Sequence, residues 1–269
     1  MSPVRQQAQA LRARLSALAI RPRPADAVPL LIDGLACGFT SLAVAEQIAA
    51  RIRGFRLHDG ALLLSAPADA DARSACLAEG ASMLRDAGIV RGWRDEQLDV
   101  PDPRGGAPLA RIERAACRTL AIATTAVHLN AWAPDGRLWV ARRAAHKAID
   151  PGCWDTLVGG MVPAGEPELE ALHREAHEEA GLRLAAIPVR RGGSVRFERP
   201  VAEGFQVETI RVFDAELPDA VVPRNVDGEV DAFALQTVRE TLAGIAAGRF
   251  TLEAALVTIE GILARETAP

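Results

Sequence analysis

The sequence lacks several features that would place it in particular classes of protein. It contains no run of about 18 consecutive apolar residues, so we expect no transmembrane helix. Residues 1–23 carry arginine throughout and no continuous apolar stretch, so we expect no signal peptide there. Tyrosine is absent, and aromatic residues make up only 4% of the chain. We interpret the low aromatic content and the abundance of alanine and arginine as a compositional bias of the genome that has no functional meaning.

The chain also has few cysteines and no excess of positive charge. The chain has four cysteines, far apart and without a C-x-x-C pair: Cys37, Cys76, Cys117 and Cys153. This spacing excludes a disulfide framework or a zinc site and predicts free thiols in a reducing, cytoplasmic compartment. Lys and Arg number 31 against 35 Asp and Glu, which gives a net charge of −4. We therefore expect no binding to nucleic acid or to anionic membranes.

What remains is the composition of an ordinary globular protein. The chain has 269 residues, of which 49% are hydrophobic and 25% charged, so it can bury a sizeable core. At roughly 150 residues per domain, this length suggests one large or two modest domains. A Pro/Gly-rich loop at residues 101–106 and a change of pattern near residue 120 favour two. We predict an α+β accessory domain over residues 1–118 and an α/β domain over residues 119–269.

Local patterns predict alternating helices and strands. Helices are expected over residues 6–19, 41–52, 69–87, 168–180 and 251–265, with Ser41 as an N-cap. Strands are expected in a hairpin over residues 55–64 and over residues 126–132, 138–141, 157–160, 207–213 and 230–235. Strands and helices mixed within about 145 residues suggest an α/β sandwich for the second domain.

The strongest motif covers residues 160–182, which read GMVPAGEPELEALHREAHEEAGL. Pro167 suits the first helical position and Gly181 suits a left-handed C-cap. The helical period predicts a buried stripe made of Leu169, Leu172, Ala176 and Ala180.

The acidic residues of this helix carry its chemistry. The same period places Glu175, Glu178 and Glu179 on an arc of roughly 100°. Carboxylates so close together repel each other unless a cation lies between them, and Arg174 alone cannot neutralise them. Hard oxygen ligands on a rigid helix suit Mg²⁺, or Mn²⁺, and such ions support hydrolysis of a diphosphate linkage.

The spacing G-x5-E-x7-R-E-U-x-E-E-x-G-U, in which U is apolar, resembles the Nudix box and matches its fixed positions. The resemblance implies a Nudix α/β/α sandwich with a mixed sheet. It implies that Glu175, Glu178 and Glu179 bind the metal, and that Glu166 supports the loop or the metal shell. Arg174 would orient Glu178 or Glu179, or hold the loop. The general base varies in this family between a box glutamate, such as Glu175 or Glu178, and a glutamate of a later loop, for which Glu229 is the candidate.

The resemblance extends to both sides of the box. Upstream are Gly92-Trp93-Arg94-Asp95-Glu96, Ile112-Glu113-Arg114 and the stretch from Leu138 to Asp155; downstream are Glu216-Leu217-Pro218 and Asp227-Gly228-Glu229-Val230. These motifs resemble Nudix proteins with an extra N-terminal domain, related to the Nudix part of fungal thiamine pyrophosphokinase. This subgroup implies action on thiamine diphosphate-like molecules, with a preference for oxidised forms. Two departures are Val207-Glu208 in place of a basic–acidic pair and Glu253 in place of asparagine.

Four further residues are candidates for substrate binding. Arg142, Arg143 and Lys147 offer positive charge to a diphosphate, and Trp154 offers a ring for stacking. The sequence thus predicts a Mg²⁺-dependent pyrophosphohydrolase with a small-molecule diphosphate substrate, and leaves a homodimer open.

Three alternatives remain at this point. One is a house-cleaning hydrolase of nucleoside diphosphate derivatives. Another is an isomerase similar to isopentenyl-diphosphate isomerase, which would need Cys153 as an acid. The third is a ligand-binding regulator without hydrolysis, although such proteins typically lose box carboxylates that this chain keeps.

Overall fold

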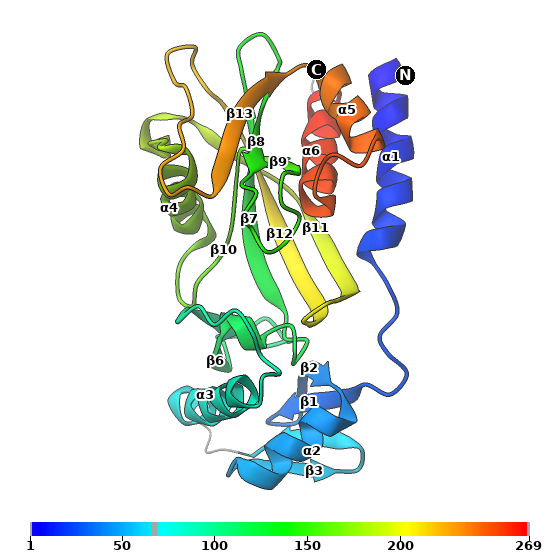
Figure 1. The fold of residues 1–269 in the computed structure, drawn as a ribbon, viewed down its shortest axis with the longest axis vertical. Helices are drawn as coiled ribbons and strands as arrows, with labels where there is room; N and C mark the ends of the chain where they lie inside the picture. The colour runs from blue at the N-terminus through cyan, green and yellow to red at the C-terminus, as the bar shows by residue number, and fades with distance from the viewer. Residues whose placement is uncertain (1, 66–68, 268–269) are drawn as a thin grey trace.

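The computed structural model describes residues 2–65 and 69–267. Its elements form two units, one above the other in Figure 1. The lower one, called here the N-terminal unit, contains β1–β6, α2 and α3. The upper one, called here the sandwich unit, contains β7–β13, α4, α5, α6 and also the first helix of the chain, α1.

The N-terminal unit is built on a four-stranded sheet of order β2-β1-β4-β3. Its strands are β1 Val28–Ile32, β2 Leu35–Thr40, β3 Phe55–His58 and β4 Ala61–Leu64, and its helices are α2 Leu42–Arg51 and α3 Ala70–Asp86. Only the β1–β4 pairing of this sheet is parallel. A separate hairpin, β5 Gln97–Val100 with β6 Ala110–Glu113, packs on α3 and joins the same core. This is the α+β organisation that the sequence predicts.

The sandwich unit contains a mixed sheet of order β11-β12-β7-β8-β13. The strands are β7 Thr124–Trp132, β8 Leu138–Arg143, β11 Val189–Val201, β12 Gly204–Glu216 and β13 Val230–Gln236. Two short strands complete it: β9 Trp154–Thr156 beside β8, and β10 Val158–Met161 beside β7. The pairing of β12 with β7 is parallel and the other pairings are antiparallel.

Helices cover both faces of this sheet. Figure 1 shows α4 Glu168–Ala180 on one side and α1 Pro3–Ala19, α5 Val238–Ala246 and α6 Leu252–Arg265 on the other. Each face has its own apolar core, one against α4 and one against the three remaining helices. The expected α/β/α sandwich with a mixed sheet, preceded by a smaller α+β domain, is therefore confirmed.

The first helix packs far from its neighbours in sequence. Ala8, Leu11, Leu15 and Ala19 are buried in the core that contains α6, whereas Leu18 is 51% exposed. Residues 3–19, which the division at 118/119 assigns to the accessory domain, thus contact the sandwich unit. That division stays a prediction.

The two units meet around residues 118–121. From the N-terminal unit, the N–H of Phe39 donates to the Leu120 carbonyl oxygen at 2.9 Å. From the sandwich unit, the N–H of Phe205 donates to the Arg118 carbonyl oxygen at 2.8 Å. Phe39, Ala121 and Phe205 share a small buried cluster. The joint between the units is therefore hydrogen-bonded and packed on both sides.

Most local predictions agree with the structure. The five predicted helices and the hairpin with its turn at Asp59-Gly60 are present, and the Ser41 hydroxyl accepts from the N–H of Val44 as the predicted N-cap. The sequence did not reveal β1, β2, β5, β6, β9, β11 or α5. All four cysteines are free.

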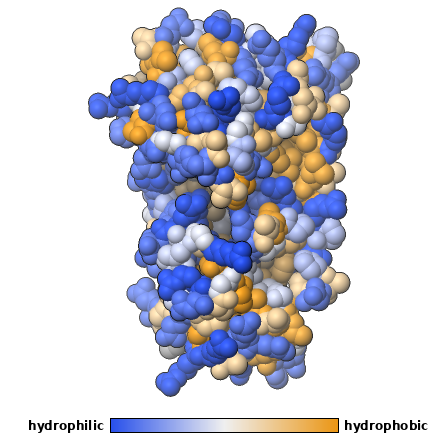
Figure 2. Space-filling view, viewed as in Figure 1, coloured by the Kyte–Doolittle hydropathy of each residue, from blue (hydrophilic) through white to orange (hydrophobic). Residues whose placement is uncertain are grey.

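The helices and one face of the surface bear on whether the chain could span a membrane. Among residues 2–65 and 69–267, no helix is both long and apolar enough to cross a bilayer. The face seen in Figure 2 is mostly hydrophilic, with apolar residues in smaller patches.

Candidate active site

The helix α4 begins and ends close to the predicted residues. Pro167 was predicted as the first helical residue but is the N-cap, and Gly181 has the predicted left-handed conformation with φ +65°. The predicted buried stripe is partly wrong, because Leu169 is 47% exposed and Ala171 is buried instead. The helical period gives the direction of a side chain but not which residues of other elements pack against it. The stripe consists mainly of alanines, so α4 lies close to the sheet.

Two glycines of β10 let the α4 carboxylates contact the strand. A Cβ atom at Gly160 would lie 2.1 Å from the Glu175 carboxylate, and one at Gly159 would lie 2.7–2.9 Å from the His128 ring. Glu179 accepts a hydrogen bond from the N–H of Gly159 at 3.1 Å. Both positions therefore require glycine, because any larger side chain would displace the groups packed on the strand.

Arg174 links three of the predicted carboxylates. Its guanidinium donates to Glu166 at 3.0–3.3 Å, to Glu175 at 2.9 Å and to Glu178 at 3.1 Å. The hydrogen bonds to Glu166, followed by the charge of Glu175, raise the pKa of Arg174. Of the two carboxylates that Arg174 was expected to orient, it contacts Glu178, and it also holds the loop through Glu166.

Two partly buried carboxylates lack full compensation of their charge. Burial raises the pKa of Glu179 well above its usual value, and the nearby charge of Glu175 raises it further. Burial also raises the pKa of Glu175, although Arg174 opposes this. Glu179 forms no ion pair with any residue that the structure describes. A carboxylate that is withdrawn from water is costly to keep charged unless a positive group lies beside it.

These donors fit a divalent cation in chemistry. Carboxylate oxygens are the ligands that Mg²⁺ prefers, and a cation beside Glu175 and Glu179 would supply the missing charge. In the described part of the chain, however, no three acidic, histidine or cysteine side chains already converge as a metal site. Arg174 bonds to Glu175 and Glu178 in this arrangement, so those two side chains would have to turn to act as ligands.

The opposite wall of the site comes from β8, β9 and the segment before β13. Glu179 shares a small pocket with Glu229, Lys147, Arg143 and Asp155. Lys147 pairs with Glu229, and Arg143 donates to Asp155 at 3.0 Å. Burial alone would raise the pKa of Glu229, but the hydrogen bond and charge of Lys147 bring it below its usual value. Glu229 is therefore ionised near neutral pH.

Two predicted substrate-binding residues lie elsewhere. Trp154 packs beside Phe250 in the core under α5 and α6, and Arg142 is exposed and does not line the pocket that contains Glu179. Sequence reasoning did not select Asp155, Thr156 or His128 for the site. The buried His128 ring and the Thr156 hydroxyl lie within hydrogen-bond distance, 2.8 Å apart. The available signal for Asp155 was its position in the sequence, between Trp154 and the short predicted strand that leads to Gly160 of the box.

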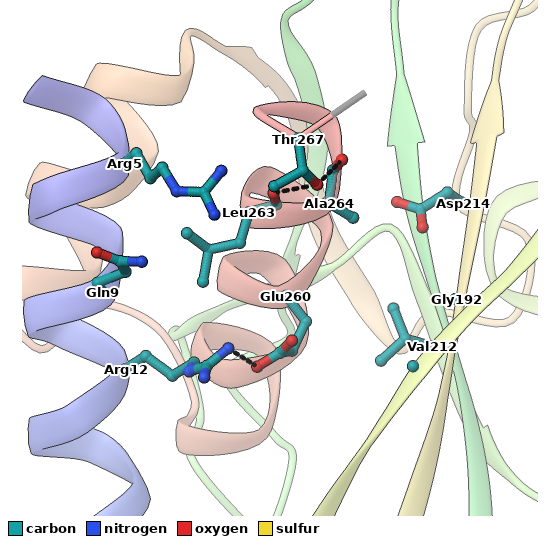
Figure 3. Close-up of a pocket in the computed structure, with 11 residues that line it drawn as sticks. Arg5, Gln9, Arg12, Gly192, Val212, Asp214, Glu260, Leu263, Ala264 and Thr267 are labelled. Atoms are coloured by element: carbon teal, nitrogen blue, oxygen red, sulfur yellow. Dashed lines mark hydrogen bonds and ion pairs between the residues drawn. The ribbon is translucent and has the colours of Figure 1, made fainter. Parts of the chain in front are cut away.

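A second pocket lies on the other face of the sheet. Figure 3 shows its lining residues, with Arg5 and Arg12 on α1, Glu260 on α6, and Asp214 on β12 at the far side of α6. Arg12 pairs with Glu260 at 3.1 Å across it. None of the predicted site residues lines this pocket, so it is separate from the candidate active site.

Comparison with known proteins accounts for both units. The NUDIX domain family matches residues 122–255, and a domain of unknown function, DUF4743, matches residues 11–124. The chain belongs to the Nudix family. Its Nudix domain follows a DUF4743 domain, which agrees with the expected N-terminal addition.

Curated relatives carry the same family name. The chain is 34% identical to Nudix hydrolase 20, chloroplastic, of Arabidopsis thaliana over 68% of this chain and 50% of that protein. It is 33% identical to Nudix hydrolase 24, chloroplastic, of the same plant over 62% of this chain and 47% of that protein. The chain spans about half the length of these relatives. The relation to thiamine pyrophosphokinase does not emerge from the comparisons and stays a prediction.

Among solved structures, a Deinococcus radiodurans protein is 26% identical, with a TM-score of 0.49, over 64% of this chain and all of that one.

Proposed function

We propose that this Nudix protein hydrolyses a diphosphate linkage in a small molecule with the help of a divalent cation. The observation that carries the proposal is Glu179, a partly buried carboxylate beside Glu175 that has no cationic partner among the described residues. Glu175, Glu178 and Glu179 would hold the cation, Mg²⁺ or Mn²⁺, with Glu166 supporting them through Arg174. When bound, the cation supplies positive charge to the phosphate oxygens.

The remaining residues have distinct roles in this proposal. Arg174 restrains Glu175 and Glu178 before the substrate arrives. Lys147 and Arg143 line the pocket and face the diphosphate. Glu229 is ionised, lies outside the Arg174 network and accepts the proton of the attacking water. Glu175 and Glu178 remain the alternative bases within the box.

For the substrate, we propose thiamine diphosphate or its oxidised forms. The support is the resemblance of the motifs that flank the box. Nucleoside diphosphate derivatives are the second candidate class, since the relatives are named Nudix hydrolases. A regulator without hydrolysis is disfavoured because the chain keeps all the box carboxylates. A cytoplasmic location and a homodimer complete the proposal, although both plant relatives are named chloroplastic.

The test measures kcat/KM for thiamine diphosphate, its oxo form, ADP-ribose and dGTP in Mg²⁺, with products identified by mass. We expect the oxo form to be the best substrate and no turnover without a divalent cation. A clear preference for ADP-ribose or dGTP would overturn the thiamine proposal alone. Absence of hydrolysis across a wide diphosphate panel would overturn the hydrolase proposal.

The metal ligands are tested on whichever substrate is preferred. Glu178→Gln and Glu179→Gln each remove a ligand charge with little change of shape, so kcat should fall by roughly 10²-fold or more. Glu179→Gln should also keep or raise the melting temperature without metal, because it removes a buried charge. Wild-type rates in either folded variant would contradict the metal assignment.

A further inference from the structure

The N-terminal unit contacts the box loop directly. The N–H of Ala164 donates to the Gln97 carbonyl oxygen at 2.8 Å, and the N–H of Gly165 donates to Asp99 Oδ2 at 2.9 Å. Glu166, the partner of Arg174, follows at once in the sequence. The strand β5 therefore lies along the edge of the candidate active site.

The segment before β5 is held by contacts with β6 and α3 and by one contact within itself. The buried Glu113 carboxylate accepts from the N–H of Arg94 at 3.0 Å, and the indole N–H of Trp93 donates to Asp95 at 2.8 Å. The Arg85 guanidinium lies 4.5 Å from the centre of the Trp93 ring. These contacts hold the backbone on both sides of Arg94.

The guanidinium of Arg94 is nevertheless free. The side chain is exposed and has no hydrogen bond or ion pair with any residue that the structure describes. Its charge helps to lower the pKa of Glu229, after the larger effect of Lys147. Its neighbour Arg114 pairs with Glu96 at 2.7 Å, and the charge of Arg114 helps to lower the pKa of Glu175.

The other cations around the pocket are already engaged. Lys147 pairs with Glu229, Arg143 pairs with Asp155, and Arg174 bonds to three glutamates. Arg94 differs from them because it offers positive charge without a carboxylate partner. An arginine in this state is suited to bidentate binding of phosphate oxygens.

We infer that Arg94 binds an anionic phosphate group of the substrate, so that the N-terminal unit forms one wall of the substrate-binding site. Glu113 is the positioning residue that holds Arg94 at this wall. The inference deepens the proposed function and rests on it in placing a diphosphate at the Nudix box.

The test measures binding of methylenediphosphonate, a diphosphate that cannot be hydrolysed at its bridge, to the full chain in Mg²⁺ by calorimetry. Arg94→Ala should weaken binding by about tenfold or more, because a charge-assisted contact is lost, and Arg94→Lys should have an intermediate effect. Arg91→Ala is the matched control: Arg91 is exposed in the same segment and bonds only to the Gly88 carbonyl oxygen. Thermal melting verifies that each variant is folded.

Turnover on the preferred substrate gives a second readout. Arg94→Ala should raise KM by about tenfold and change kcat much less, whereas a general structural defect would lower both. Unchanged probe affinity in Arg94→Ala, equal losses in Arg91→Ala, or no probe binding by the wild-type chain would overturn the inference.

The two proposals fail separately. Binding of the probe that depends on Arg94, together with no hydrolysis of any diphosphate, would leave the inference standing and overturn the hydrolase. Hydrolysis with unchanged probe affinity and KM in Arg94→Ala would leave the hydrolase proposal standing and overturn the inference about Arg94.

Discussion

At the scale of single residues, the buried polar groups of the sandwich unit differ in how well they are compensated. Glu208 and Glu253, which belong to the two departures from the family pattern, come close together in space. The Gln206 amide donates to Glu208 at 3.1 Å and to Glu253 at 3.2 Å, and Arg199 pairs with Glu253 at 2.7 Å. Arg199 thus compensates Glu253 directly, whereas Glu208 has no ion pair among the described residues.

Glu208→Gln should therefore stabilise the protein at neutral pH. Burial, and next the charge of Glu253, raise the pKa of Glu208 above its ordinary value of 4.5. The folded state then holds this proton more tightly than the unfolded state, so stability is lost as the pH rises from about 4.5 through the folded pKa. The variant should melt a few degrees higher than wild type at pH 7, with the difference shrinking toward pH 4.

Glu216→Gln provides the control for this prediction. Glu216 ends the same strand and is exposed, so its replacement should not shift the melting temperature in the same way. A Glu208→Gln variant that melts below wild type at pH 7 would show that the hydrogen bonds of the carboxylate outweigh its burial.

At the scale of elements, caps and glycines determine where the helices end. In α3, Asp69 accepts from the N–H groups of Asp71 and Ala72 at the start, and Gly88 takes the left-handed conformation just beyond the end. Gly80 lies within the same helix, and a Cβ atom there would meet nothing within 4 Å. The two glycines therefore have opposite structural roles.

Alanine substitution should separate these roles. Gly80→Ala should stabilise the N-terminal unit by about 0.5–1 kcal/mol, because alanine is the better helix former. Gly88→Ala should destabilise it by about 1 kcal/mol, because φ +72° is strained for a residue with a Cβ atom. Denaturant unfolding measures both, and a destabilising Gly80→Ala would mean that the helix needs its flexibility there.

Prediction at this scale succeeded where the signal is local. The helix α4 and the hairpin β7–β8 follow from helical or alternating periodicity and from Gly181 and Gly136 at their ends. The strand β11 was missed because its burial alternates irregularly and it contains the bulge at Gly192-Gly193. The exposure of Leu169 was missed because it depends on which residues of other elements pack against the helix.

At the scale of the whole molecule, the chain crosses between its two units more than once. It starts in the sandwich unit with α1, builds the N-terminal unit, and returns through residues 118–121 (Figure 1). A fragment that begins at residue 119 would leave the surface of α6 that α1 covers exposed to water. We therefore expect such a fragment to aggregate, and addition of residues 1–21 as a separate segment to improve its solubility.

Limited proteolysis tests the same arrangement in the intact chain. The loop at residues 101–106 connects β5 to β6 and is largely exposed, so we expect cleavage there before the α4 region. The two pieces should remain together on gel filtration, because β5 pairs with β6 and α1 holds to α6. Cleavage that begins within residues 126–182 while this loop stays intact would contradict the prediction.

The sequence by itself determined the box and its chemistry. The spacing of Glu175, Glu178 and Glu179 places them on one arc because a helix repeats every 3.6 residues, and this holds without knowledge of the rest of the fold. The same local rules predicted the α/β character of the chain and the caps of its helices.

Only the tertiary structure decided what faces the box. Glu229 and Lys147 come to Glu179 through the pairing of β13 with β8, and Trp154 and Arg142 do not line that pocket. The structure also places β5 of the N-terminal unit against the box loop and packs α1 on α6, which lie at opposite ends of the sequence. Such contacts depend on strand pairing and on which apolar faces bury one another, and these are properties of the whole chain rather than of any local segment.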